Sequence, residues 1–355
     1  MLTSIGRGPE REAVSEGVTV HRAIEDWTLS ENGRGTLRRM NELLRSEGVD
    51  VVHVLFPDSV LQGRYQLPAA IGLGRQPLVT TFWNLGLGRR SPVSIKLEAL
   101  ALLGRSSVLT SHDPGYLSAL QRIARGVKPV RWLPVGTNIG LETRRSPNAV
   151  RRELGLREVP LLGYFGQLDF TRGVEDLFEA LADMRRDGSD VRLMMIGAAD
   201  SARYEVYLAL AERLGLAEAV LWTPWLGPGQ AAETLAAVDL CVLPYRRNSL
   251  GRSALAAALT LGVPTVLAGT EERIAPLVGG RDVELVPPGD PASLARTLQQ
   301  LLDDEDARVR LREGASVAGR HFAWPRIAEA ALSVYGEAIR FRRFRRSGSD
   351  GPAAA

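Results

Sequence analysis

The sequence is poor in cysteine, and it has no long apolar run. Cys241 is its only cysteine, which excludes a disulfide framework and favours a reducing compartment. No apolar run reaches the roughly 20 residues that cross a bilayer as a helix. The first residues, MLTSIGRGPEREAV, lack the apolar core of a signal peptide. We therefore expect a cytoplasmic protein.

Lysine is also scarce, because Lys96 and Lys128 are the only lysines among 44 basic residues. A compositional bias of the genome explains so much arginine most simply. Phosphate binding is the alternative, since a guanidinium grips phosphate with two parallel hydrogen bonds. The basic residues are dispersed without a stripe that carries interleaved aromatics, which argues against a nucleic-acid partner. The four histidines are scattered and no carboxylates cluster, so we expect no metal.

Short apolar runs alternate with amphipathic segments, as in parallel sheets built from strand–helix–strand units. The expected strands form two series: 18–24, 49–55, 77–82, 107–110 and 130–133, and then 161–166, 192–197, 219–222, 240–243, 264–268 and 283–286. Segments with helical spacing include 174–186, 202–214, 291–302, 305–320 and 324–343. Two such series predict an α/β protein with two facing Rossmann-like domains.

We place the N-terminal domain at 1–137, joined by a closing helix at 323–343, and the C-terminal domain at 138–322. Residues 344–355 are expected to form a disordered tail. The N-terminal domain is expected to be truncated, because a doubly wound domain normally opens with a core strand, a glycine-rich turn and a helix. Here a strand end, MLTS, leads into a loop. A preceding segment of about 30 residues would complete the missing unit.

Several phrases in a fixed order carry a resemblance to a known family. They are GVDVVHVLFPDS, VRWLPVGTNI, YFGQLDFTRGVEDLFEAL, VDLCVLPY, LGVPTVLAG, VELVPPGDPASLARTL and FAWPRIAEAALSVY. From about Val49 onward the chain resembles the family 4 (group 1) retaining glycosyltransferases, which have the double-Rossmann glycosyltransferase B-type fold. The resemblance implies transfer of a sugar, with retention, from a nucleoside-diphosphate sugar to an acceptor hydroxyl, without a cofactor.

The resemblance places the donor site in the C-terminal domain. Arg172 lies where the family has the lysine of its G-R-L-x3-K-G segment, and it would bind the donor diphosphate and stabilise the leaving group. Gly166 ends its strand and would let the donor approach the backbone. Gln167 stands where the family usually has arginine, so it supplies a hydrogen bond without charge. The alternative for Arg172 is a solvated arginine at the start of a helix.

The loop at 248–258 departs from the usual pattern. The family's two glutamates, eight positions apart, would fall at Ser249 and Ala257. The sequence SLGRSALAAALTLG resembles a divergent branch in which Ser249, Arg252 and Ser253 line the donor site. Ser253 is a candidate N-cap, whereas a cation such as Arg252 is disfavoured at a helix start, which hints at function.

A pair of acidic residues follows the next predicted strand. Glu271 and Glu272 fall where the family has two glycines near the donor sugar. Glu272 is our candidate for accepting hydrogen bonds from sugar hydroxyls. For at least one of the two we prefer a first-turn position on a surface helix.

The N-terminal domain offers weaker candidates. Trp83 stands in TTFWNLG where the family has a histidine, and an indole can stack on a sugar face but cannot act as a base. His53 and His112 lie near predicted strand ends, and we interpret each as structural rather than catalytic. Asp58, Asn84 and Asp113 are further candidates of the same kind, because they follow predicted strands.

The acceptor stays open among a glycan, a lipid-linked sugar and a small molecule. Two alternatives also stay open: a non-catalytic relative that binds nucleotide sugars or serves as a scaffold, and a nucleotide-sugar epimerase on the same frame. The basic segment 340–346, RFRRFRR, is interpreted as the end of a helix. Its alternative role is peripheral contact with the anionic inner face of a membrane.

Overall fold

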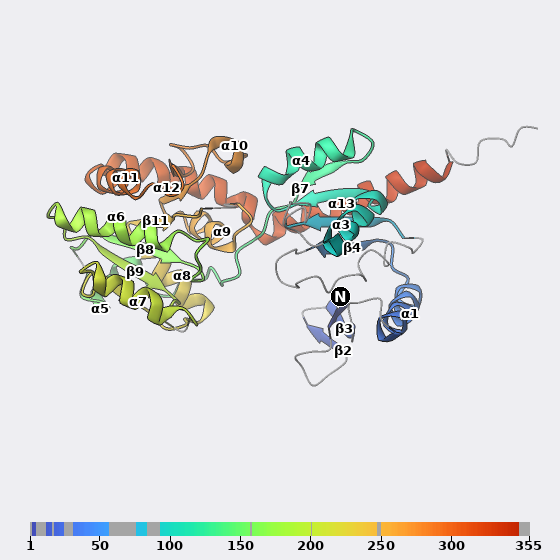
Figure 1. Ribbon diagram of the computed structural model, residues 1–355, viewed down its shortest axis with the longest axis horizontal. Coiled ribbons are helices and arrows are strands. Elements are labelled where there is room, and N and C mark those ends of the chain that lie inside the picture. The colour runs from blue at the N-terminus through green and yellow to red at the C-terminus, as the bar shows by residue number, and fades with distance from the viewer. Residues whose placement is uncertain are drawn as a thin grey trace, which may run out of the picture. The chain divides into compact units, whose positions relative to one another are not determined.

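The computed structural model describes residues 2–4, 12–15, 18–24, 31–56, 76–83, 93–156, 158–199, 201–246 and 250–347 (Figure 1). The chain divides into two compact units. Unit 1 comprises Met1–His112, Tyr116–Leu133 and Glu329–Ala355, and unit 2 comprises Asp113–Gly115 and Pro134–Ala328. Each unit contains a parallel sheet with helices. The predicted α/β class is therefore confirmed.

Unit 1 is built around a four-stranded parallel sheet of order β4-β5-β6-β7. Its strands are β4 (Val52–Phe56), β5 (Leu78–Phe82), β6 (Val108–Ser111) and β7 (Val130–Trp132). The crossovers α3 (Val93–Arg105) and α4 (Pro114–Ala124) pack their apolar residues on one face of this sheet. Part of α13 (Trp324–Ser347) contributes Val334 and Ala338 to a separate core with Val79 and Val108.

A second, three-stranded sheet lies near the start of unit 1, in the order β1-β3-β2. β1 (Leu2–Ser4) pairs parallel with β3 (Val18–Ile24), and β2 (Glu12–Ser15) pairs antiparallel with it. β3 was predicted, whereas β2 falls in a stretch that was predicted to be a loop. Helix α1 (Glu31–Ser46) follows and was also missed. The four residues of β2, EAVS, are too short a pattern to recognise alone.

A chain of hydrogen bonds crosses the sheet of unit 1. His53 is the second residue of β4, and its Nε2 lies 2.7 Å from the Thr81 hydroxyl of β5. Thr81 in turn bonds the Thr110 hydroxyl of β6. On its other side, His53 Nδ1 lies 2.9 Å from the hydroxyl of Tyr335 on α13. This network ties three strands to one helix, which supports the structural interpretation of His53.

Unit 2 is built around a six-stranded parallel sheet of order β10-β9-β8-β11-β12-β13. Its strands are β8 (Leu161–Phe165), β9 (Arg192–Ile196), β10 (Val220–Trp222), β11 (Leu240–Leu243), β12 (Thr265–Ala268) and β13 (Glu284–Val286). Its helices are α5 (Pro147–Glu153), α6 (Val174–Arg186), α7 (Tyr204–Arg213), α8 (Pro228–Ala236), α9 (Ser253–Thr260), α10 (Glu271–Ile274), α11 (Pro291–Asp303) and α12 (Glu305–Gly319), followed by the short turn η1 (Arg320–Phe322).

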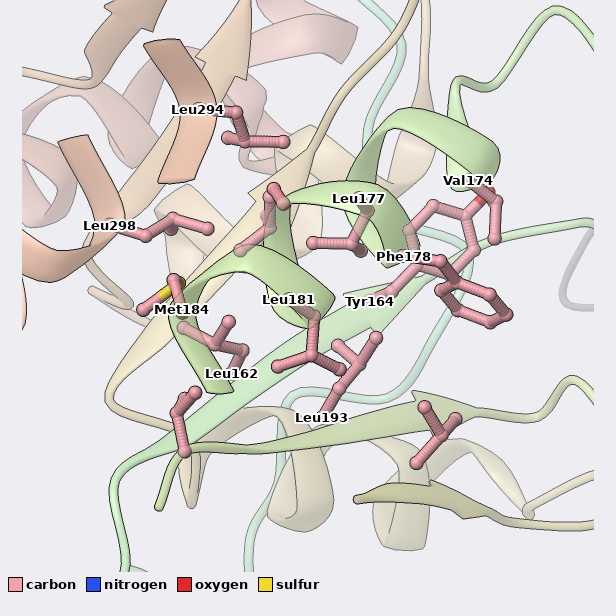
Figure 2. Packing of buried hydrophobic residues seen from close by; sticks show 14 of the residues in the cluster. Leu162, Tyr164, Val174, Leu177, Phe178, Leu181, Met184, Leu193, Leu294 and Leu298 are labelled. Carbon is pink, nitrogen blue, oxygen red and sulfur yellow. The ribbon is translucent and has the colours of Figure 1, made fainter. Parts of the chain in front are cut away.

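The core of unit 2 explains why α6 forms where its sequence predicted it. Apolar residues recur at helical spacing, and Leu177, Phe178 and Leu181 are fully buried. Figure 2 shows these side chains between the strands β8 and β9 and the helix α11, which adds Leu294 and Leu298. Truncating a buried leucine or phenylalanine to alanine typically costs about 2–5 kcal/mol. The position of α6, and of the loop that precedes it, is therefore firmly fixed.

Local sequence signals fix the starts of the last helices. Asp290 accepts a hydrogen bond from Ser293 N at the start of α11, and Asp304 accepts one from Ala307 N at the start of α12. Pro291 lies in the first turn of α11, where a backbone N–H has no partner within the helix, so the missing N–H of proline removes no hydrogen bond.

The end of the chain departs from the prediction in one respect. Helix α13 runs to Ser347, so it enters the segment that was expected to be disordered. The rest of that tail, 348–355, lies outside the described residues. Within the described helices, none is both long and apolar enough to cross a membrane.

The buried histidine predicts a pH dependence of stability. Burial lowers the pKa of His53 to about 4, and the nearby His112 acts in the same direction, whereas an unfolded histidine titrates near 6.5. The unfolded chain then binds more protons between these two values. Stability should be full above pH 6.5 and fall by about 3 kcal/mol as the pH drops through 4. Urea unfolding at pH 7 and at acidic pH measures this loss.

Carboxyl groups also titrate in this pH window. The slope of stability against pH must therefore be compared between matched variants. His53→Gln keeps hydrogen-bonding capacity without a titrating ring and should flatten the slope. His321→Gln removes an exposed histidine in η1 and should keep the parent slope. An unchanged slope in His53→Gln would contradict the assignment.

Candidate functional site

The strand order of unit 2 creates a topological switch point in the sheet. From β8 the chain moves outward through β9 and β10 and then returns to place β11 on the other side of β8. The loops after β8 and β11 therefore leave the same edge in opposite directions. In open parallel sheets, ligands bind outside the carboxyl ends of the strands at such a switch point. Residues that follow β8 and β11 are consequently the first candidates for a site.

The loop after β8 requires glycine at both of its ends. Gly166 directly follows the strand with φ +154°, and Gly173 precedes α6 with φ +68°. A Cβ added to Gly173 would lie 1.9 Å from the carbonyl oxygen of Pro244, which directly follows β11. Only glycine, which has no Cβ, fits at this position. The start of α6 thus packs directly on the chain that leaves β11.

Arg172 lies at the start of α6 but is not a solvated surface arginine. Its side chain is only 11% exposed, and its Nε donates to Asp169 Oδ2 at 2.9 Å. Asp169 is itself held by the loop, since its Oδ1 accepts from Thr171 N. Burial acts to lower the pKa of Arg172, but the hydrogen bond to Asp169 together with the charge interactions with Tyr245, Tyr164 and Asp169 outweighs it, and the pKa is raised. The guanidinium is therefore a fixed cation.

Arg252 enters the same site from α9. Its guanidinium lies 5.4 Å from the centre of the Tyr245 ring, and that of Arg172 lies 5.6 Å from the same centre. Burial lowers the pKa of Arg252, and the positive charge of Arg172 lowers it further. A guanidinium still keeps its proton at neutral pH. Two like charges from different loops are therefore held close together.

The prediction that Ser253 caps α9 is wrong. Arg252 is the N-cap residue, with extended backbone angles and without a capping hydrogen bond from its side chain, and Ser253 is the first helical residue. The arginine side chain instead extends toward Tyr245. The cap position is thus occupied by a cation against the local preference of a helix start.

Tyr245 is the residue of this site that the sequence analysis missed. It is 1% exposed, and its hydroxyl has no hydrogen-bond partner within the described part of the chain. Burial raises its pKa to about 12, while Arg172 acts in the opposite direction. Its ring is approached by both guanidiniums, and an aromatic face attracts cations. The available signal was an aromatic residue placed directly after the apolar strand segment VLP.

The remaining predicted donor-site residues are less closely joined to this cluster. Gln167 is exposed, and its backbone carbonyl accepts from the Tyr164 hydroxyl at 2.7 Å. Ser249 lies outside the described residues. Glu272 is exposed on α10, after β12, and bonds to its own backbone N–H and the Thr270 hydroxyl lower its pKa. The adjacent Glu271 accepts from Gly279 N at 3.4 Å, which suits a structural role.

Charges of both signs meet at the site. Asp169 pairs with Arg172, and the positive end of the α6 dipole is partly offset by Glu175 and Asp176 in the first turn of the helix. The neighbouring Arg246 is neutralised by Asp176, which lies 2.6 Å from it. Fixed guanidiniums at a helix start bind anions with several oxygens. The arrangement can therefore hold a phosphate or diphosphate group.

Two candidates of unit 1, His112 and Trp83, lie next to each other. The Nδ1 of His112 lies 2.6 Å from the Leu133 carbonyl, and burial lowers its pKa. The edge of its ring packs on Trp83, which is 44% exposed. Asp113, which belongs to unit 2, is buried and accepts from Gly115 N; burial raises its pKa, and the charges of Arg273 and Arg252 act in the opposite direction. Asp58 and Asn84 lie outside the described residues, and the described part of the chain contains no group of three or more metal-ligating side chains.

Comparison with known proteins begins with the part of the chain that holds this cluster. The family model described as "Glycosyl transferases group 1" matches residues 159–304. Gly166, Arg172, Tyr245 and Arg252 all lie within this match.

Curated relatives carry related names. The D-inositol 3-phosphate glycosyltransferase of Corynebacterium diphtheriae is 31% identical over 211 residues, which are 57% of this chain and 49% of the relative. The enzyme of the same name from Xylanimonas cellulosilytica is 32% identical over 222 residues, 60% of this chain and 52% of the relative. The chain thus matches these relatives over about half of their length.

Solved structures extend the likeness to the fold of most of the chain. Sucrose-phosphate synthase from Thermosynechococcus elongatus aligns with a TM-score of 0.74 at 19% identity, covering 96% of this chain and 88% of that one. HepE of Anabaena in complex with UDP aligns with a TM-score of 0.71 at 17% identity, covering 86% and 83%. At these identities the likeness concerns the fold. The chain has the two-domain fold of these proteins, and residues 159–304 match the family model of the group 1 glycosyl transferases.

Proposed function

We propose that the chain is a retaining glycosyltransferase of family 4 that transfers a sugar from a nucleoside-diphosphate sugar to an acceptor hydroxyl. The observation that carries this proposal is the approach of Arg172 and Arg252 to one buried ring, Tyr245, at the switch point of the sheet. Two fixed cations beside a helix start suit a diphosphate, the part common to all such donors.

The two arginines have complementary roles in this proposal. During transfer the bond between the sugar and the diphosphate breaks, and negative charge grows on the leaving phosphate oxygens. Preorganised cations stabilise such charge without reorganising at the moment of reaction. Arg172, held by Asp169, supplies one fixed donor from the loop after β8. Arg252 supplies the second from the start of α9. Gly166 leaves room for the donor beside the backbone, and Gln167 and Glu272 are candidates for polar contacts with the sugar nucleotide.

The nature of donor and acceptor is suggested only by likeness. Structures of HepE contain UDP and UDP-glucose, which makes these the first donors to test. The curated relatives are named for D-inositol 3-phosphate, a small phosphorylated alcohol. A growing glycan or a lipid-linked sugar remains an equal acceptor candidate. Synthesis of glycans or glycoconjugates in the cytoplasm, at the inner face of the membrane for a lipid-linked acceptor, fits this chemistry.

A non-catalytic nucleotide-sugar-binding role is favoured by one observation. Ala257, where the family pattern has a glutamate, is fully buried in α9 and offers no polar group. Release of UDP or another nucleoside diphosphate from its sugar donor, measured with and without acceptors, separates the two functions. Binding without any release or transfer would favour the non-catalytic role, and absence of binding would remove both.

Loss of either arginine should weaken binding of nucleoside diphosphates. A charge-assisted hydrogen bond contributes about 1.5–3 kcal/mol, so Arg172→Ala and Arg252→Ala should each raise the Kd by about ten- to a hundredfold. Arg172→Lys should retain part of the affinity, because it keeps the charge but loses the planar fork. Calorimetric titration with UDP and other nucleoside diphosphates measures these changes.

A surface arginine on the same helix provides the control. Arg186→Ala removes a 71% exposed side chain paired with Asp183 at the far end of α6 and should leave the affinity unchanged. Arg172→Ala also removes contacts with Asp169 and Tyr245, so a modest loss of thermal stability is expected. Equal affinity in the parent and both site variants would refute the donor site.

Substitution of Tyr245 should separate its ring from its hydroxyl. Tyr245→Phe keeps the ring beside both guanidiniums and removes a buried hydroxyl without a partner, so stability and affinity should be maintained. Tyr245→Leu removes the aromatic face, and since a cation–π contact contributes about 0.5–2 kcal/mol, the Kd should rise about two- to thirtyfold. Calorimetry and thermal melts measure both effects. If the phenylalanine variant bound as weakly as the leucine variant, the hydroxyl would be the important group.

A further inference from the structure

The outward face of unit 1 formed by α3 and α4 has an unusual composition. Apolar side chains that are normally buried are exposed on α3: Val93 is 70%, Leu97 62% and Leu100 54% exposed. Their spacing of four and then three residues places them in one stripe along the helix. On α4 and the turn that follows it, Ile123 is 41% and Val127 61% exposed. A helix of unit 1 thus presents leucine and valine where a surface helix normally presents charge.

The charges on this face have one sign. Basic side chains accompany the apolar ones: Arg105, Arg122 and Arg125 are exposed, and Lys96 and Lys128 are half-buried. The described span 93–128 contains two acidic residues, Glu98 and Asp113, and both are buried, at 4% and 6% exposure. Burial raises the pKa of Glu98 to about 7, which reduces its negative charge further. No exposed carboxylate of this span therefore opposes the basic groups.

The two helices form one continuous surface. Both pack their inner faces on the same core, in which Ala99 and Leu102 of α3 meet Leu120 and Ala124 of α4. Lys128, in the turn after α4, donates to the Leu103 carbonyl at 2.6 Å and also to the Gly104 carbonyl, so it caps the end of α3. The exposed Val127 beside it therefore lies next to the end of the α3 stripe.

This surface is separate from the basic end of α13. Val334 and Ala338 of α13 pack against Val79 of β5, whereas the core beneath α3 contains Leu78 and Phe82 of the same strand. Alternate residues of a strand point to opposite faces of a sheet. The α3–α4 surface therefore covers the opposite face of the sheet from α13.

We propose that the α3–α4 surface binds the face of an anionic lipid bilayer, with Leu97 and Leu100 entering the headgroup boundary and the basic side chains contacting lipid phosphates. Apolar residues flanked only by cations are the composition of a membrane-surface helix. Each basic side chain near an anionic leaflet adds further attraction. Arg122 and Arg125 line a shallow depression with Ala119 and Ile123, which suits a headgroup phosphate.

Charge and side-chain type argue against the other occupants. A second copy of the chain docked through the same face would bring like charges together at close range. A nucleic acid would match the charge, but aliphatic leucine and valine offer no stacking surface for bases. An anionic bilayer satisfies both the apolar and the basic side chains at once.

Vesicle co-sedimentation of the full-length chain tests the proposal. The protein should bind vesicles of phosphatidylcholine mixed with phosphatidylglycerol at physiological ionic strength, and much less to phosphatidylcholine alone. Replacing Leu97 and Leu100 with serine should weaken binding by roughly tenfold or more. Replacing Lys96 and Arg122 with glutamine should weaken it about thirtyfold.

Matched variants on unit 2 control for general loss of apolar surface or charge. Val206→Ser with Val317→Ser removes side chains that are 56% and 57% exposed on α7 and α12. Arg213→Gln with Arg310→Gln removes two exposed charges from the same helices. Both control pairs should bind vesicles like the parent, and all variants should keep the parent's thermal melt, because the substituted side chains lie at the surface.

The outcome does not depend on the proposed enzymatic function, since no donor or acceptor is present in the assay. A parent chain that stays in solution with anionic vesicles would overturn the proposal. So would α3–α4 variants that bind as tightly as the control pairs, because the basic end of α13 would then account for the binding.

Discussion

The close contact between Gly173 and the carbonyl of Pro244 fixes the relation between the two loops of the site. One loop leaves β8 and the other leaves β11, and the left-handed backbone of Gly173 lets the first press on the second without a side chain between them. Arg172 directly precedes this contact and Tyr245 directly follows it. This backbone contact brings the guanidinium of Arg172 and the ring of Tyr245 together, with 5.6 Å between the guanidinium carbon and the ring centre.

Holding two guanidiniums close together costs electrostatic free energy, and the structure offsets that cost in two ways. Asp169 compensates Arg172 directly, and the quadrupole of the Tyr245 ring attracts both cations. Burial lowers the pKa of Arg252, and the positive charge of Arg172 acts in the same direction. A bound polyanion would relieve the repulsion between the two guanidiniums. This repulsion is thus a physical reason to expect anion binding at this point.

The sequence predicted the sheet of unit 2 well because its strands are buried on both faces and its helices are amphipathic. The segments 161–166 and 174–186 differ little from β8 and α6 for that reason. Tyr245 was missed because its importance arises from contacts with residues that lie far away in the sequence. Ser253 was misplaced as a cap by one residue, since the arginine before it turns its side chain toward the site. In unit 1, β2 was missed because it is short and pairs only with β3.

In helix α3 the sequence pattern and the observed burial of the side chains disagree. Its apolar residues occupy nearly the whole circumference, so the pattern alone indicates a helix buried on all sides. In the folded chain Leu97 and Leu100 face outward, while Glu98 is buried with both carboxylate oxygens lacking partners in the described structure. A protein that needed only a stable core would exchange these positions, because an unpartnered buried carboxylate is costly. That the chain keeps leucine outside and glutamate inside indicates that the outer face of α3 serves a purpose other than stability.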